Sequence, residues 1–196
     1  LQGMTAEYLI RRTYAVKPGD TVLFHAAAGG VGLIACQWLK QIGATVIGTV
    51  GSDEKAAIAK AHGCDHPIVY TREKFAERVR EITDGKGVPV VYDSIGNDTY
   101  LGTLDCLAPR GLFVSFGNAS GPIKNFDVGQ LAAKGSLYLT RPSLVSYTST
   151  PADLKESSTA LFAAIAKGLK IEINQRYALK DAAQSHRDLE ARKTTG

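Results

Sequence analysis

Short runs of β-branched and apolar residues alternate along the chain with stretches in which apolar residues recur every three or four positions. The short runs predict strands at residues 21–24, 44–50, 67–70, 88–93, 111–116 and 136–140, with a further strand at 171–177. The other stretches predict helices at 5–14, 33–42, 73–83, 127–134, 152–167 and 179–192. Two more helices are expected, one from a cap at Ser52 or Asp53 to residue 61 and one from a cap at Asn97 or Asp98 to residue 107.

This alternation of strand and helix is typical of right-handed βαβ units. Parallel strands that are joined by helices need both faces of their sheet covered. We therefore expect an α/β fold, a doubly wound parallel six-stranded sheet of order 3-2-1-4-5-6 with helices on both faces.

The turn after the first strand carries the sequence A-A-G-G-V-G at residues 27–32. A strand, a tight glycine turn and a helix in this order predict a site for a dinucleotide pyrophosphate. Gly29 lets the backbone approach the phosphates, and Gly32 lets the helix pack against the strand. The N–H groups at the start of the helix then face the anion. Ala27 replaces the first glycine of the usual pattern and adds only a methyl group.

The end of the second strand bears on the choice between NAD and NADP(H). An NAD site usually has an acidic residue there, about 20 residues beyond the glycines, which binds the ribose 2′-OH. Gly51 and Ser52 instead leave room for a 2′-phosphate, and Lys55 stands one helical turn further on, which favours NADP(H). Asp53 and Glu54 keep NAD open, because either side chain reaches the ribose if the strand ends two or three residues later.

Other candidate residues follow the remaining strands, where a doubly wound sheet binds its ligands. Tyr70 and Arg72 are candidates for the adenosine end of the cofactor. Small-residue loops at 94–96 and 117–121 allow a flat ring to lie against backbone. The loop after the sixth strand, at 140–143, adds Arg141, the fixed cation among these three loops. We interpret His25 as a structural histidine. The sequence shows no nucleophile with its base, which suits hydride transfer, since the cofactor carries that chemistry.

Composition narrows the classes of function further. The 196 residues are 44% hydrophobic and 21% charged, as in ordinary soluble domains, and no apolar run approaches the length of a membrane span. The net charge of +4 comes from scattered basic residues, so we expect neither nucleic acid nor membrane as a partner. Cys36, Cys64 and Cys106 are far apart in the sequence, which predicts free thiols in a reducing cytoplasm and no metal site.

Five spaced motifs together resemble a known family, at residues 24–32, 48–52 with Lys55, 91–96, 115–118 and 139–144. They look like the NADPH-dependent quinone oxidoreductases, the zeta-crystallin-like, zinc-free branch of the medium-chain dehydrogenase/reductase superfamily. The resemblance implies that residues 1–196 are the NADP(H)-binding Rossmann domain of a two-domain protein whose GroES-like catalytic lobe is absent. Residues 1–14 would be a lead-in helix, and residues 171–196 would return toward that lobe. A helical pattern that is already under way near Leu1 also suggests a fragment.

The resemblance further implies an activity, transfer of a hydride from NADPH to a quinone. Enoyl or alkenal reduction on the same scaffold and NADPH binding without turnover remain the alternatives. Residues 136–140 would pair across a two-fold axis in a homodimer, and the catalytic residues would lie mainly in the missing lobe. The implied cofactor-binding residues are Ala28, Gly29, Gly30, Val31, Ser52, Lys55, Tyr70, Ser94, Phe116, Asn118 and Arg141.

Overall fold

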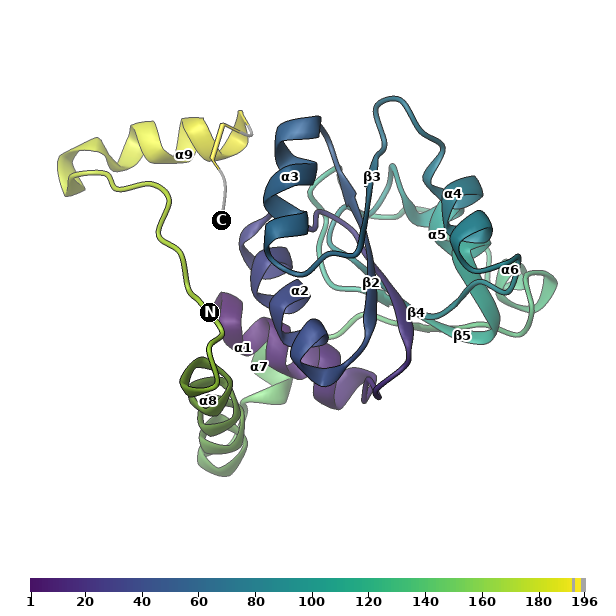
Figure 1. Cartoon of the computed structure of the whole chain (residues 1–196), viewed down its shortest axis with the longest axis horizontal. Helices are drawn as coiled ribbons and strands as arrows, with labels where there is room; N and C mark the ends of the chain where they lie inside the picture. The colour runs from purple at the N-terminus through teal and green to yellow at the C-terminus, as the bar shows by residue number, and fades with distance from the viewer. Residues whose placement is uncertain (192, 195–196) are drawn as a thin grey trace.

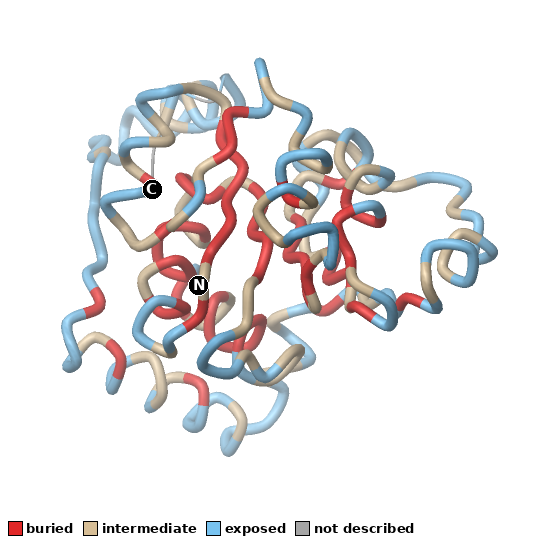
Figure 2. Tube along the Cα trace, turned by 45° about the vertical axis from the view of Figure 1, so that its right-hand side comes forward, coloured by how far each residue is buried: buried red, intermediate tan, exposed pale blue. Residues whose placement is uncertain are grey.

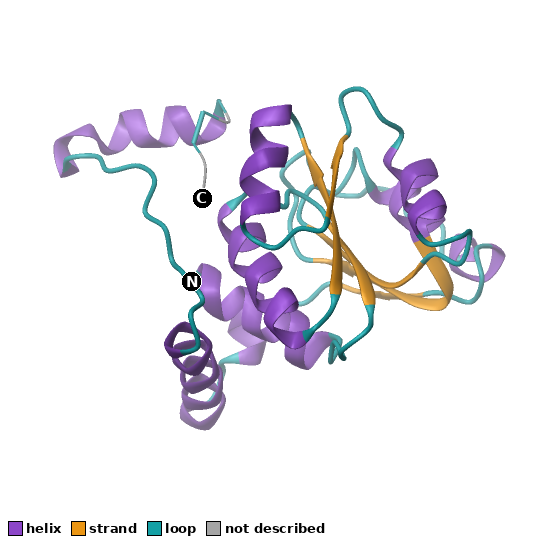
Figure 3. Cartoon of the chain, viewed as in Figure 1, coloured by secondary structure: helices purple, strands orange, loops and turns teal. Residues whose placement is uncertain are grey.

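Six parallel strands form one sheet in the order β3-β2-β1-β4-β5-β6, with helices on both faces (Figure 1, Figure 3). The computed structural model describes residues 1–191 and 193–194. The predicted doubly wound order is confirmed. The strands are β1 (Thr21–Phe24), β2 (Thr45–Val50), β3 (His66–Val69), β4 (Val88–Asp93), β5 (Leu107–Ser115) and β6 (Tyr138–Thr140).

The central strand β1 sets the register of the sheet. Thr21 lies opposite Thr45 of β2, and Leu23 lies opposite Val91 of β4. Successive side chains of a strand point to opposite faces, so each strand contributes to two cores. One core contains Phe24 with the apolar faces of α1, α2 and α8, and the other contains Leu23 with those of α4 and α5. Figure 2 shows the buried strands between more exposed helices.

The helices mostly follow the predicted ranges. They are α1 (Gln2–Glu7), which continues as the π-helix η1 (Tyr8–Thr13), α2 (Gly30–Ile42), α3 (Asp53–Ala61), α4 (Phe75–Ile82), α5 (Tyr100–Cys106), α6 (Gly129–Ala133), α7 (Leu144–Tyr147), α8 (Pro151–Ala166) and, after the 3-10 turn η2 (Leu179–Asp181), α9 (Ala182–Glu190). Within the described residues, no helix is both long and apolar enough to cross a bilayer.

The predicted strand at 171–177 is wrong. This segment carries the chain away from α8 toward α9 and runs beside none of the six strands of the sheet (Figure 1). A strand needs a neighbouring strand that forms hydrogen bonds with its backbone N–H and C=O groups. At Lys170, just before this segment, a side chain forms these bonds instead. Gln37 Nε2 donates to the Lys170 carbonyl at 3.1 Å, and Gln37 Oε1 accepts from the Lys170 N–H at 2.9 Å.

Some helices also differ from the prediction. Neither Asn97 nor Asp98 caps α5, because the helix begins at Tyr100 and its N-cap is Thr99. The Asn97 and Asp98 N–H groups donate to residues 121 and 120 of the loop after β5. The first helix changes to π geometry at Tyr8, and the four-residue α7 was not predicted, since it is too short to show a helical period. The last helix ends at Glu190, and its predicted end at Arg192 lies outside the described residues.

Candidate functional site

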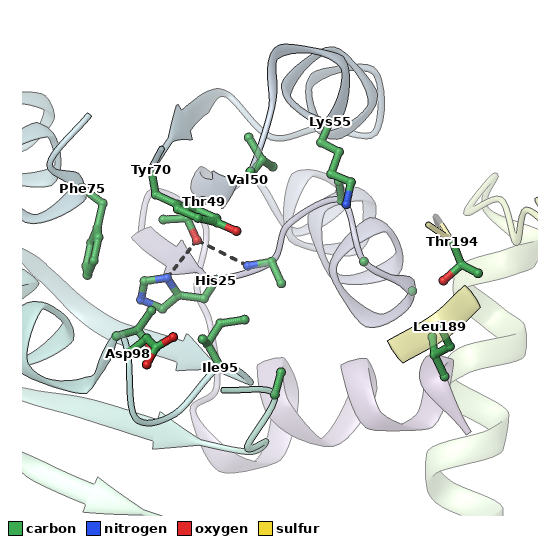
Figure 4. A pocket seen from close by; sticks show the side chains of 17 residues that line it. His25, Thr49, Val50, Lys55, Tyr70, Phe75, Ile95, Asp98, Leu189 and Thr194 are labelled. Carbon is green, nitrogen blue, oxygen red and sulfur yellow. Dashed lines mark hydrogen bonds between the residues drawn. The ribbon is translucent and has the colours of Figure 1, made fainter. Parts of the chain in front are cut away.

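A cavity of about 530 Å³ opens at the carboxyl edge of the sheet, where β1, β2, β3 and β4 end (Figure 4). The winding of the chain reverses between β1 and β4, and doubly wound sheets bind ligands at this point. The glycine turn, the loops after the other strands and the C-terminal segment all contribute to the cavity. Its lining residues are His25, Ala26, Ala28, Gly29, Gly30, Thr49, Val50, Gly51, Lys55, Tyr70, Phe75, Ile95, Asp98, Thr99, Ala119, Leu189 and Thr194.

The glycine turn brings the end of β1 directly against the start of α2. Ala26 has a left-handed φ of 54°, and its carbonyl accepts the Gly29 N–H at 2.9 Å. A Cβ on Gly32 would lie only 2.4 Å from that carbonyl oxygen, so the packing role predicted for Gly32 is confirmed. The first backbone bond of α2 runs from Leu33 to Gly29, which leaves the N–H groups of residues 30–32 without a carbonyl in the helix. Those groups, at the positive end of α2, suit a phosphate.

The first turn of α3 presents a cation to the same cavity. Ser52 is the N-cap of α3, and its Oγ accepts the Lys55 N–H at 3.2 Å, which settles the alternative of an Asp53 cap. Lys55 and Tyr70 both line the cavity (Figure 4). The Tyr70 hydroxyl lies 3.0 Å from where a Cβ on Gly51 would stand, so the missing side chain of Gly51 makes room for the ring. An ammonium group and a phenol therefore flank the end of β2.

The structure brings some of the predicted cofactor-binding residues to this cavity and leaves others outside it. Ala28, Gly29, Gly30, Lys55 and Tyr70 line it, whereas Val31, Ser52, Ser94, Phe116, Asn118 and Arg141 do not. The loops that carry Ser94 and Asn118 are nevertheless joined, since the Ala119 N–H donates to the Ser94 carbonyl at 3.0 Å. Phe116 packs against Phe24, with ring centroids 5.7 Å apart. Arg141 follows the edge strand β6, two strands beyond β4.

His25 is bonded through both ring nitrogens inside the protein. Its Nδ1 lies 2.8 Å from Thr49 Oγ1, and its Nε2 lies 3.0 Å from Thr103 Oγ1. Thr103 Oγ1 donates its one proton to Asp93 Oδ2 at 3.2 Å, so His25 Nε2 is the ring donor and Nδ1 accepts from Thr49. This network ties the ends of β1, β2 and β4 to α5. The interpretation of His25 as a structural histidine is confirmed, although it also lines the cavity.

Complete burial of the His25 ring lowers its pKa below the usual value, despite the opposing effect of Asp93. In the unfolded chain this histidine takes up a proton below about pH 6.5, whereas in the folded chain it stays neutral to lower pH. The free energy of unfolding should therefore fall as the pH drops below about 6.5, by up to about 1.4 kcal/mol per pH unit from this group. Urea unfolding at a series of pH values measures this loss.

The His25→Gln variant should lose less stability than the wild type between about pH 6.5 and 5, because it removes the buried base. Exposed His66 provides the matched control, and His66→Gln should keep the wild-type slope. Equal slopes for all three proteins would contradict a depressed His25 pKa.

Several lining residues were missed by the sequence reasoning, although Ile95 belongs to the candidate loop 94–96. Thr49 stands beside the end of β2, so the rule that selected the residues after strand ends was nearly sufficient to find it. Leu189 and Thr194 reach the cavity from the far end of the chain (Figure 4). No local pattern signals such a long-range approach.

The cysteines do not form a reactive or metal-binding group. Cys36, Cys64 and Cys106 are free and buried. Burial raises the pKa of the Cys106 thiol to about 12, so it stays protonated at neutral pH. Among residues 1–191 and 193–194, no three His, Cys, Asp or Glu side chains are grouped as ligands for a metal ion.

Comparisons with known proteins agree with this geometry. The sequence model of the zinc-binding dehydrogenases matches residues 30–163. A quinone oxidoreductase of Pseudomonas aeruginosa is 57% identical over the whole chain, which covers 61% of that protein. The crystal structure of Escherichia coli quinone oxidoreductase complexed with NADPH is 53% identical, with a TM-score of 0.97, and the chain covers 61% of it. A 2-haloacrylate reductase of a Burkholderia species is 50% identical, and the chain covers 60% of that protein.

The chain thus spans about three fifths of the length of the curated relatives that it matches. The predicted resemblance to quinone oxidoreductases of the medium-chain dehydrogenase/reductase superfamily is confirmed, and the chain belongs to the zinc-binding dehydrogenase family.

Proposed function

We propose that this chain is the NADPH-binding domain of a quinone oxidoreductase. The observation that carries this proposal is the meeting of Lys55 and Tyr70 with the glycine turn in one cavity. The turn and the start of α2 suit a pyrophosphate, and a cation beyond β2 suits a 2′-phosphate. The related Escherichia coli quinone oxidoreductase forms a crystalline complex with NADPH, which supports the same cofactor here.

The residues present fit this cofactor and define what the domain does. The N–H groups of residues 30–32 hold the pyrophosphate, and Lys55 neutralises part of the 2′-phosphate charge. Ser94, Phe116, Asn118 and Arg141, further along the same edge, are proposed to surround the nicotinamide end. Bound NADPH supplies a hydride from C4 of its nicotinamide. The domain contributes position and polarity to that transfer.

We propose that residues 1–196 form one domain of a two-domain protein. The 61% coverage of the relatives leaves room for a second lobe, which would form the other wall of the substrate cleft. That lobe would supply most of the residues that contact the quinone. The three free, buried thiols favour a cytoplasmic location.

A second candidate substrate is a conjugated acceptor such as an enoyl compound. The 50% identity to a 2-haloacrylate reductase favours it, since that name describes reduction of a conjugated carboxylate. Steady-state assays of the full-length protein with quinones and with acrylate-type acceptors separate the two. A kcat/KM at least about tenfold higher for quinones supports the first assignment.

The cofactor assignment is tested by calorimetric titration of the full-length protein with NADPH and with NADH. We expect NADPH to bind at least about tenfold more tightly, a difference of about 1.4 kcal/mol. Equal or tighter binding of NADH would overturn the assignment of the 2′-phosphate corner. Absence of binding for both would overturn the proposed function itself.

We further propose a homodimer that forms through the outer edge of β6. This strand is the last of the sheet, and its Tyr138 and Leu139 side chains are 61% and 38% exposed. An apolar strand edge of this kind is an aggregation hazard unless another strand covers it. Pairing of β6 with its copy across a two-fold axis would satisfy both edges at once.

The Tyr138→Lys variant of the full-length protein should shift the equilibrium toward monomer, because two lysines would face each other near the axis. Sedimentation velocity measures this shift. Leu154→Lys on α8 makes the same kind of change at a 48% exposed apolar site away from the edge, and it should leave the dimer intact. A dimer that resists Tyr138→Lys, or a monomeric wild type, would contradict the interface.

A further inference from the structure

β2 ends at Val50, and Asp53 follows three residues later, close to the strand end where an NAD site has its acidic residue. It comes 21 residues after Gly32, which matches the spacing of about 20 residues for the carboxylate that binds the ribose 2′-OH. Lys55, two residues later, points to NADP(H) instead. The sequence therefore carries the signature residues of both cofactors in the first turn of α3.

The structure separates the two side chains. Lys55 lines the cavity, whereas Asp53 does not and is bonded to Arg72, with 2.5 Å between Oδ2 and Nη1. The bond joins the first residue of α3 to the loop between β3 and α4. The start of α3 and this loop flank the corner that Lys55 and Tyr70 occupy.

Backbone contacts hold Arg72 in position for this bond. Its N–H donates to the Val69 carbonyl at 3.1 Å, and the Val69 N–H donates to Glu73 Oε1 at 3.0 Å, so the loop is closed on the end of β3. On the other side, the Ser52 cap fixes the start of α3. The ion pair therefore joins two anchored segments.

An exposed ion pair of this kind adds little to the stability of a fold. Asp53 and Arg72 are both exposed, so the value of the pair for folding is small. Its effect on a ligand is larger, because a free carboxylate beside the cavity would accept a ribose hydroxyl and repel a 2′-phosphate. The Arg72 guanidinium beside Asp53 holds the pKa of that carboxyl below its usual range, so the group is ionised at neutral pH and depends on its partner for neutralisation.

We propose that Arg72 is a specificity residue that acts through Asp53. By binding this carboxylate, Arg72 keeps it from accepting the ribose hydroxyl of NAD and from repelling the 2′-phosphate, so that the site selects NADPH. This inference rests on the proposed binding of NADPH. It assigns to Arg72 no contact with the cofactor, so its effect must vanish when Asp53 is made neutral.

The test is a double-mutant cycle on the full-length protein, read by titration with NADPH and NADH. Arg72→Ala should weaken NADPH binding by about three- to tenfold, the order expected when one unit charge is uncovered within a Debye length of a phosphate. NADH binding should stay the same or become tighter. The double variant Arg72→Ala/Asp53→Asn should bind NADPH within about twofold of the wild type, since both charges are gone.

Lys74→Ala is the matched control, because Lys74 is an exposed cation of the same region that pairs with Glu77 at 2.9 Å and does not line the cavity. It removes the same charge and should leave both affinities unchanged. A double variant as weak as Arg72→Ala would overturn the inference and assign Arg72 to the cofactor directly. Equal values for Arg72→Ala and Lys74→Ala would also overturn it. The wild-type titration separately reports whether the proposed function fails.

Discussion

The Lys55→Ala variant of the full-length protein should bind NADPH at least about tenfold more weakly than the wild type and bind NADH equally well. Lys55 lines the cavity from the first turn of α3, where the Ser52 cap fixes its backbone. Its ammonium group faces the corner assigned to the 2′-phosphate, which NADH lacks. Loss of a charge-assisted contact to a phosphate costs about 1.5–3 kcal/mol, which corresponds to a factor of ten or more. Calorimetric titration with both cofactors measures it.

Lys60→Ala supplies the control, because Lys60 is an exposed lysine near the other end of the same helix. It changes the net charge equally and should leave NADPH binding intact. The ratio of the two cofactor affinities is the decisive quantity. If Lys55→Ala weakens NADPH and NADH equally, the lysine contacts a part that both cofactors share, and the assigned corner is wrong.

The sequence was sufficient for the order of the sheet because the signals of a βαβ unit are local. The short apolar run of β1, the glycine turn and the apolar stripe of α2 lie within 22 residues of each other, between Thr21 and Ile42. Each constrains the next, since a tight turn between a strand and a helix allows few geometries. The packing role of Gly32 followed from the same local pattern.

What the sequence left open depends on contacts between distant residues. The segment 171–177 has the composition of a strand, but composition does not specify a neighbouring strand, and in the structure it has none in the sheet. The cap of α3 remained open between Ser52 and Asp53 because both are good caps, and the choice rests on which oxygen meets the Lys55 N–H.

In the site, too, local signals were predictable from the sequence and contacts between distant residues were not. Lys55 and Tyr70 were found from strand ends, and both line the cavity. The bonds of His25 to Thr49 and Thr103 span 24 and 78 residues, and no periodic pattern reveals them. The pairing of Asp53 with Arg72 spans 19 residues and could not be read from the sequence, although it bears directly on the cofactor.

The Gly32→Ala variant should be the most destabilising single change near the site. The added Cβ would lie 2.4 Å from the Ala26 carbonyl oxygen and 2.7 Å from the Ala27 carbonyl carbon and oxygen. All three are backbone atoms, so relief requires α2 to move away from β1. Overpacking costs about 1–3 kcal/mol, and rigid backbone neighbours place this site at the upper end of that range. Urea unfolding of the full-length protein measures the loss.

Gly129→Ala is a suitable control, because Gly129 is also in the first turn of a helix and its nearest neighbour is the Asp127 side chain at 3.1 Å, which can rotate away. Alanine favours a helix over glycine by about 1 kcal/mol, so this variant should be neutral or more stable. Its outcome isolates the contact with the β1 turn from the general effect of glycine replacement. If Gly32→Ala were as stable as Gly129→Ala, α2 would have to adjust without disturbing the turn, and close packing of helix on strand would no longer explain the glycine.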